Sequence, residues 1–212
     1  VMADQLLRLT DAQRTSQGVS ELSMLSSLSE AARLHALDMA VRGYASHQDL
    51  EGRTHLDRVR MLERSRLIGA FGANIVIVKA GASAEDVQKV IMADEANAAN
   101  LKRDEFDHMG VAAVEANGVL YVVELFARID GQLNTPVPMV AAPRTNLAAD
   151  YSDQFEPVGW SVVSANGETL MRGIGSKMPA SVPEISEGFL QMDVELGNSI
   201  YTLRGPAISS SL

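Results

Sequence analysis

The stretch Ser29–Arg58, SEAARLHALDMAVRGYASHQDLEGRTHLDR, decides the fold, because it predicts a helix, a break and a second helix. Ser29 can cap the first helix, whose small and medium side chains recur at helical spacing. Gly43 ends that helix, and Thr54 can cap the helix that follows. The loop between them carries His47, so we expect a rigid frame to hold an imidazole within reach of solvent.

The composition narrows the classes of function. The chain has 212 residues, a formal net charge of −9 and no cysteine. The acidic balance argues against nucleic acid and anionic membrane surfaces as partners, and the lack of cysteine excludes disulfides and thiolate metal sites. No apolar run is long enough to span a bilayer. The opening VMADQLLRLT lacks a basic segment followed by an apolar run, so we expect no signal peptide in this chain.

The region to residue 130 predicts helices packed around an antiparallel sheet. Its clearest signal is a hairpin, in which HMGVAAVEA and VLYVVELFARI are joined by Asn117-Gly118. The second run is apolar on both faces, as expected for a central strand covered by helices. Ser83 opens a capping box for a helix over 83–101, and GAFGANIVIVKAG, 69–81, predicts a loop with a short strand.

The character of the sequence changes after residue 130. Residues 131–150 hold several prolines and predict an extended linker. Short strand-like runs follow over 151–212, separated by glycine, asparagine and proline, and predict a small all-β module with Trp160 in its core. The predicted organisation is therefore a first domain over 1–130, a Pro-rich linker over 131–150 and a β-module over 151–212.

Four segments of the first region resemble the CAP superfamily, or SCP domain family, in its bacterial branch. They are LLRLTDAQRTSQGV, AARLHALDMAVRGYASHQDLEGRTHLDRV, FGANIV and VIMADEANAANLKRDEFDHMGVAAV, in family order across residues 3–129. The resemblance implies an α+β fold: a three-layer α-β-α sandwich in a secreted or periplasmic protein. It also implies a shallow cleft with two histidines and acidic residues, which in many members bind a divalent metal.

The family motif transfers only in part to this chain. The loop histidine corresponds to His47, but the glutamate of the family's Gly-Glu-Asn becomes Ala73, followed by Asn74. The second histidine falls on Asn97, and the helix acid falls on Asp94 or Glu95. The residues that the resemblance places at the cleft are His47, Ala73, Asn74, Asp94, Glu95 and Asn97.

Only one metal ligand of the family pattern, His47, is retained. Zinc needs about three or four protein donors, and an asparagine oxygen suits calcium or magnesium better. We therefore expect no cofactor. A Zn, Mg or Ca site remains an alternative if the fold brings Asp94, Glu95 or His108 close to His47. The other histidines have simpler interpretations: His35 as a hydrogen-bonded core residue, and His55 and His108 as surface residues.

Two functions follow as hypotheses. The first is an extracytoplasmic binding or interaction protein whose metal and acid–base cleft is largely lost, and whose β-module contacts a protein or cell-envelope partner. The alternative is a hydrolase of peptide or cell-wall material, with His47 as general base beside Asp94 or Glu95. Lipid binding is a third, weaker hypothesis taken from the family. Ligand identity, oligomeric state and strand order in the β-module cannot be read from the sequence.

Overall fold

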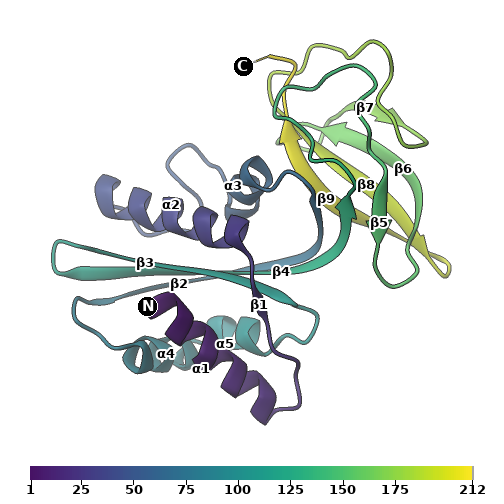
Figure 1. Ribbon diagram of the computed structural model, residues 1–212. Coiled ribbons are helices and arrows are strands. Elements are labelled where there is room, and N and C mark those ends of the chain that lie inside the picture. The colour runs from purple at the N-terminus through teal and green to yellow at the C-terminus, as the bar shows by residue number, and fades with distance from the viewer. Residues whose placement is uncertain (212) are drawn as a thin grey trace. The chain divides into compact units, whose positions relative to one another are not determined.

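The computed structural model describes residues 1–211, and its internal contacts divide the chain into two units (Figure 1). Unit 1 holds residues 1–59 and 70–128, and unit 2 holds residues 60–69 together with the chain from Ile129 onward. Two long strands, β2 (Arg66–Lys79) and β4 (Val119–Leu133), contribute residues to both units. The predicted boundary at residue 130 and the predicted linker stay predictions. The helices are α1 (Met2–Ser16), α2 (Ser26–Arg42), α3 (His55–Leu62), α4 (Ala84–Ala93) and α5 (Glu95–Lys102).

Unit 1 is a three-layer α-β-α sandwich, which confirms the predicted fold class. Its strands are β1 (Ser23–Met24), β3 (His108–Ala116), β4 (Val119–Leu133) and β2 (Arg66–Lys79), in that spatial order. Helix α2 lies on one face of the sheet, and α1, α4 and α5 lie on the other (Figure 1). The short β1 runs parallel to β3, so the sheet is mixed rather than purely antiparallel.

Helix α2 approaches β3 closely because β3 offers a glycine at the contact. A Cβ atom on Gly110 would lie 2.3 Å from the backbone carbon of Leu28 and from the backbone nitrogen of Ser29. No real side chain tolerates such distances, since packed carbon atoms lie about 3.5–4 Å apart. Gly110 therefore fixes the separation between the sheet and the helix that carries His35.

Several turns and helix ends lie where the sequence predicts them. Asn117 and Gly118 have φ of 55° and 75°, as the predicted hairpin turn between β3 and β4 requires. Gly43 ends α2 in the left-handed conformation, with φ of 72°. The Thr54 hydroxyl accepts from the backbone N–H of Asp57 and caps α3.

Three boundaries differ from the sequence predictions. Helix α2 begins at Ser26, so Ser29 lies inside it rather than at its cap. The helix predicted over 83–101 is two helices, because the Asp94 side chain accepts from the N–H of Asn97 and starts α5. The segment 69–81, predicted as a loop with a short strand, lies mostly in the long strand β2, in which Gly72 makes room for Asn100 and Phe106 at 2.9 Å from its absent Cβ.

A buried arginine joins α1 to the segment that enters β3. The Arg14 guanidinium is fully buried and donates to the carbonyls of Leu101, Arg103 and Phe106 at 2.8–3.0 Å, and to that of Ser20 at 2.7 Å. Burial lowers the pKa of Arg14 from its usual value, yet a guanidinium stays charged at any pH that proteins meet. Its planar fork therefore donates to several backbone carbonyls at once.

Replacing Arg14 with lysine should destabilise the protein by about 2 kcal/mol, because one ammonium cannot reach all the carbonyls that the fork serves. Urea unfolding would measure the loss. Arg8→Lys, at an exposed position of the same helix, is the matched control and should leave the midpoint unchanged. Equal midpoints for the two variants would contradict the role given to Arg14.

Unit 2 is built from strands, as predicted for the C-terminal region. They are β5 (Ala149–Tyr151), β6 (Glu156–Val163), β7 (Thr169–Gly173), β8 (Gly188–Leu196) and β9 (Ser199–Ile208). The order is β9-β8-β6-β7, with the first residues of β2 beside β9 and with β5 paired to the end of β4. Trp160 lies in the apolar core of this unit with 3% exposure, as expected. In residues 1–211 no helix is long and apolar enough to cross a membrane.

Candidate functional site: the histidine pocket of unit 1

His47 lies at a pocket of about 310 Å³ in unit 1. The pocket is formed by the loop after α2, the start of α3 and one face of β2. Its wall is mostly apolar, and its polar groups are two imidazoles, one amide and one hydroxyl. The lining residues are His47, Gln48, Thr54, His55, Leu56, Phe71 and Ala73.

The prediction that His55 is a surface residue is wrong. Its side chain is 4% exposed, and its Nε2 lies 2.9 Å from Nδ1 of His47. Burial, with smaller contributions from His35 and His47, lowers the pKa of His55 to about 3. His55 is therefore a neutral imidazole under ordinary conditions, and it sits directly behind His47.

His35 is the hydrogen-bonded core histidine that the sequence predicts. Its Nε2 donates to the carbonyl of Ser46 at 2.7 Å, and its ring lies 4.5 Å from that of His55, edge to face. Burial lowers the pKa of His35 from its usual value. Three histidines thus stand in a row: His47 and His55 line the pocket, and His35 lies behind them and holds the loop that carries His47.

Asp49 holds the other side of the His47 loop. Its carboxylate accepts from the backbone N–H groups of Glu51 and Arg53, and from the guanidinium groups of Arg53 and Arg58. Burial alone would raise its pKa, but the hydrogen bonds and charge of Arg53, together with the backbone N–H of Glu51, lower it below the usual value. The carboxylate is fully used in shaping the loop, so it is not placed to orient His47.

The hydrogen bond between His47 and His55 has one favourable direction. Nδ1 of His55 is buried without a hydrogen-bond partner among residues 1–211. A buried N–H group without a partner is rarer in proteins than a buried acceptor without one, so a bare ring nitrogen suits that position better. We therefore assign the proton of His55 to Nε2, which donates to Nδ1 of His47. The remaining nitrogen of His47, Nε2, is free of this contact.

The two β2 residues predicted at the cleft point to opposite faces of the sheet. Ala73 lies with Phe71 in the His47 pocket. Asn74 is fully buried on the other face, where its amide donates to the backbone carbonyl of Asn97 at 3.1 Å. Side chains alternate along a strand, so neighbouring residues serve different layers. The sheet therefore separates Ala73 from Asn74.

Asn74 belongs to a buried polar network that the sequence analysis missed. Its amide also donates to the Glu124 carboxyl at 3.2 Å, and its oxygen accepts from Asn100 at 2.9 Å. Burial raises the pKa of Glu124 to about 7, and the bond from Asn74 opposes that rise only in part. Oε2 of Glu124 has no partner among residues 1–211. The available signal was a lone acidic residue inside the apolar run VLYVVELFARI.

Asp94, Glu95 and Asn97 are not among the residues that line the His47 pocket. Asp94 caps α5, and Glu95 lines a separate pocket of about 440 Å³ beside Lys102. Asn97 meets Asn74 through its backbone carbonyl. Of the residues predicted at the cleft, His47 and Ala73 thus meet in one pocket, whereas Asn74 and Asn97 meet on the other face of the sheet.

The donors at His47 do not fit a divalent metal. A zinc ion needs about three or four ligands, and His47 has already engaged one ring nitrogen with His55. Ala73 supplies none where the family pattern has a carboxylate. Within residues 1–211, no three histidine or acidic side chains are placed as a metal site requires.

Comparisons with known proteins agree with this fold. A Bacillus subtilis relative named "Uncharacterized protein YkwD" is 30% identical over 115 residues, which make up 54% of this chain and 43% of the relative. The chain therefore matches less than half of that relative's length. An extracellular SCP-domain protein from Bacillus anthracis superposes with a TM-score of 0.51 at 20% identity, covering 60% of this chain and 40% of that one.

Another solved structure, an outer surface protein from Borrelia burgdorferi, superposes with a TM-score of 0.50 at 16% identity, covering 58% of this chain and 90% of that one. At these identities the solved structures establish the fold alone. The family model described as CAP, the cysteine-rich secretory protein family, matches residues 7–126. That span is more than half of the chain and coincides with the α-β-α sandwich, so the chain belongs to the CAP family.

Proposed function

We propose that this chain is a binding or interaction protein that acts outside the cytoplasm, with the His47 pocket as a recognition site rather than a catalytic one. The observation that carries the proposal is the lining of the pocket, in which His47 is backed by a neutral His55 and faces Leu56, Phe71 and Ala73. The extracytoplasmic location rests on the family and on the extracellular and outer-surface relatives.

The alternative, a hydrolase, needs a different neighbour for His47. A histidine that acts as general base is commonly oriented by a carboxylate that accepts from its second ring nitrogen. Here that nitrogen meets another imidazole, and Asp94 and Glu95 lie outside the lining. The geometry therefore favours contact with a partner over proton transfer.

The choice between the two functions is tested with zinc and with substrates. In calorimetric titration, wild type and His47→Ala should give the same weak heats with zinc. Peptide and peptidoglycan substrates should show no turnover that depends on His47. Tight zinc uptake, or hydrolysis, that disappears in His47→Ala would contradict the proposal.

Recognition by the pocket has its own test. We expect wild-type protein to co-sediment with purified cell-wall fractions, and Leu56→Gln to reduce the bound fraction several-fold, because burying an amide without a partner costs about 1–3 kcal/mol. Leu50→Gln changes an exposed leucine of the preceding loop and should bind as wild type does. Equal binding by all three proteins would remove the pocket from recognition.

A further inference from the structure

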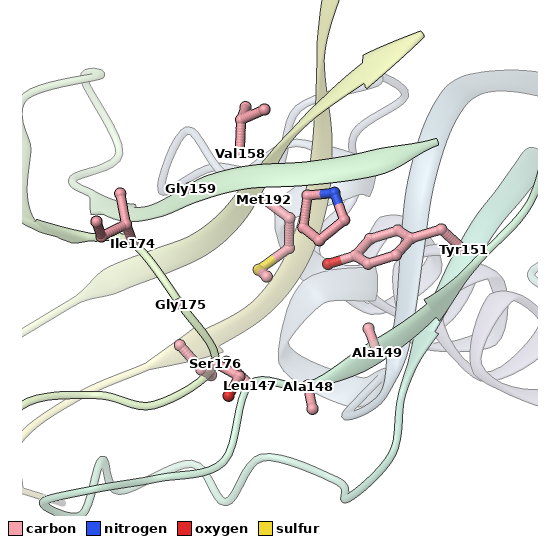
Figure 2. Close-up of a pocket in the computed structure, with 11 residues that line it drawn as sticks. Leu147, Ala148, Ala149, Tyr151, Val158, Gly159, Ile174, Gly175, Ser176 and Met192 are labelled. Carbon is pink, nitrogen blue, oxygen red and sulfur yellow. The ribbon is translucent and has the colours of Figure 1, made fainter. Parts of the chain in front are cut away.

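Unit 2 contains a second pocket, of about 500 Å³, which lies outside the histidine site and outside the residues that match the family model. It is bounded by β5, by the first half of β6 and by the segment that follows β7 (Figure 2). The lining residues are Leu147, Ala148, Ala149, Tyr151, Pro157, Val158, Gly159, Ile174, Gly175, Ser176 and Met192.

The pairing of the strands explains why a space remains here. Strand β5 pairs with β4 along one edge, and β7 pairs with β6 only from Trp160 onward. No strand therefore fills the interval between β5 and residues 157–159 of β6 in the described part of unit 2. One end of the interval is closed, because the N–H of Leu147 donates to the carbonyl of Ser176 at 2.7 Å.

The side chains around this interval are too small to fill it. Its walls carry Ala148, Ala149, Gly159 and Gly175, and Met192 lies at its base. The hollow is open to solvent along the margin formed by Val158 and Ile174, so a ligand can enter it without a change in the fold. It lies in the range of volumes that hold small organic ligands, about 300–1,000 Å³.

The chemistry of the lining selects the class of ligand. None of the eleven lining residues carries a charge. Ile174 is 84% exposed at the margin of the pocket, where a bound apolar group would remove it from water. Tyr151 extends from β5 into the space toward Met192 (Figure 2), and its hydroxyl makes no hydrogen bond among residues 1–211. One polar group of a ligand can therefore bond to this hydroxyl.

We propose that this pocket binds a small, uncharged and mainly apolar molecule that carries one hydrogen-bonding group. The apolar part contacts the exposed side chains of Ile174 and Val158, and the polar group meets the hydroxyl of Tyr151. The site is independent of the His47 pocket and gives the C-terminal strands a binding role of their own.

The experiment uses N-phenyl-1-naphthylamine, an uncharged aromatic probe with one N–H group whose fluorescence rises in apolar surroundings. Trp160, the only tryptophan of the chain, pairs across strands with Met192 and reports binding by loss of its emission. Wild-type protein should bind the probe saturably, one molecule per chain. Ala149→Phe, which fills the space, and Ile174→Glu, which charges an exposed margin, should each weaken binding about tenfold or more.

Ile200→Glu is the matched control, because Ile200 is also exposed in unit 2 but does not line the pocket. It should bind as wild type does. Circular dichroism and urea unfolding confirm that each variant is folded, and Ile174→Glu keeps the test valid if Ala149→Phe is unstable. Absence of saturable binding, or equal affinity in wild type, Ala149→Phe and Ile174→Glu, would overturn the site.

Two further outcomes address the class of ligand. Tyr151→Phe should weaken the probe a few-fold, as expected for the loss of one hydrogen bond, and unchanged affinity would overturn the role of Tyr151. Loss of binding in Ile200→Glu equal to that in Ile174→Glu would show a diffuse apolar surface instead of a pocket, and would also overturn the proposal.

Discussion

Replacing Glu124 with glutamine should free the protein from a loss of stability that wild type suffers as the pH rises. In the folded protein Glu124 is fully buried and burial raises its pKa to about 7, whereas the unfolded chain ionises near the ordinary value of about 4.3. Between these values the folded state holds a proton that the unfolded state has lost. The free energy of unfolding therefore falls as the pH rises through this window.

The size of the effect follows from the shift in pKa. Each unit corresponds to about 1.4 kcal/mol, so wild type should lose about 3 kcal/mol relative to Glu124→Gln between about pH 4 and about pH 8. Urea unfolding of both proteins across this range measures the difference. Glu115→Gln is the matched control, because Glu115 is exposed on the neighbouring strand β3. A constant difference between wild type and Glu124→Gln would show that Glu124 ionises normally.

Acid should destabilise the protein through His55, with the opposite sign. Burial lowers the pKa of His55 to about 3, so the folded state keeps it neutral while the unfolded chain takes up a proton below about pH 6.5. The contribution of neutral His55 to the free energy of unfolding is fully present above pH 6.5 and is lost as the pH falls toward 3. Over this window wild type should lose about 4 kcal/mol relative to His55→Gln.

The measurement compares the free energies of unfolding of wild type and His55→Gln at several pH values. The effects of carboxylates that both proteins share cancel in the difference. His108→Gln is the control, since His108 is half-buried and bonds to the neighbouring Asp107. NMR titration of the imidazoles gives an independent check, in which the His55 signal should stay that of a neutral ring below pH 5. A His55 signal that titrates near pH 6.5 would contradict the role of burial.

The parts of the fold that the sequence predicted correctly are those governed by short-range rules. Asn117-Gly118 specifies its turn through two adjacent residues, and Gly43 and Ser83 act within one helical turn. The identity of the family was also accessible, because its motifs are continuous in sequence. His47 was placed correctly on a loop for the same reason.

The errors arose where distant segments decide the outcome. His55 stands in the first turn of a helix, where exposure is usual, and it is buried because the His47 loop and His35 cover it. Strand β2 contains glycine where α5 comes near, so its local pattern resembled a loop. Glu124 was not predicted to be buried because an acid in a strand is commonly exposed. Its burial depends on Asn74 of another strand and on helix α5, which are distant in the sequence.

The alternation of Ala73 and Asn74 on β2 has a consequence for how such a protein can change during evolution. A substitution at 73 alters the pocket at His47 and leaves the buried amide of Asn74 with its partners. Loss or gain of a reactive group at 73 is thereby uncoupled from the integrity of the scaffold.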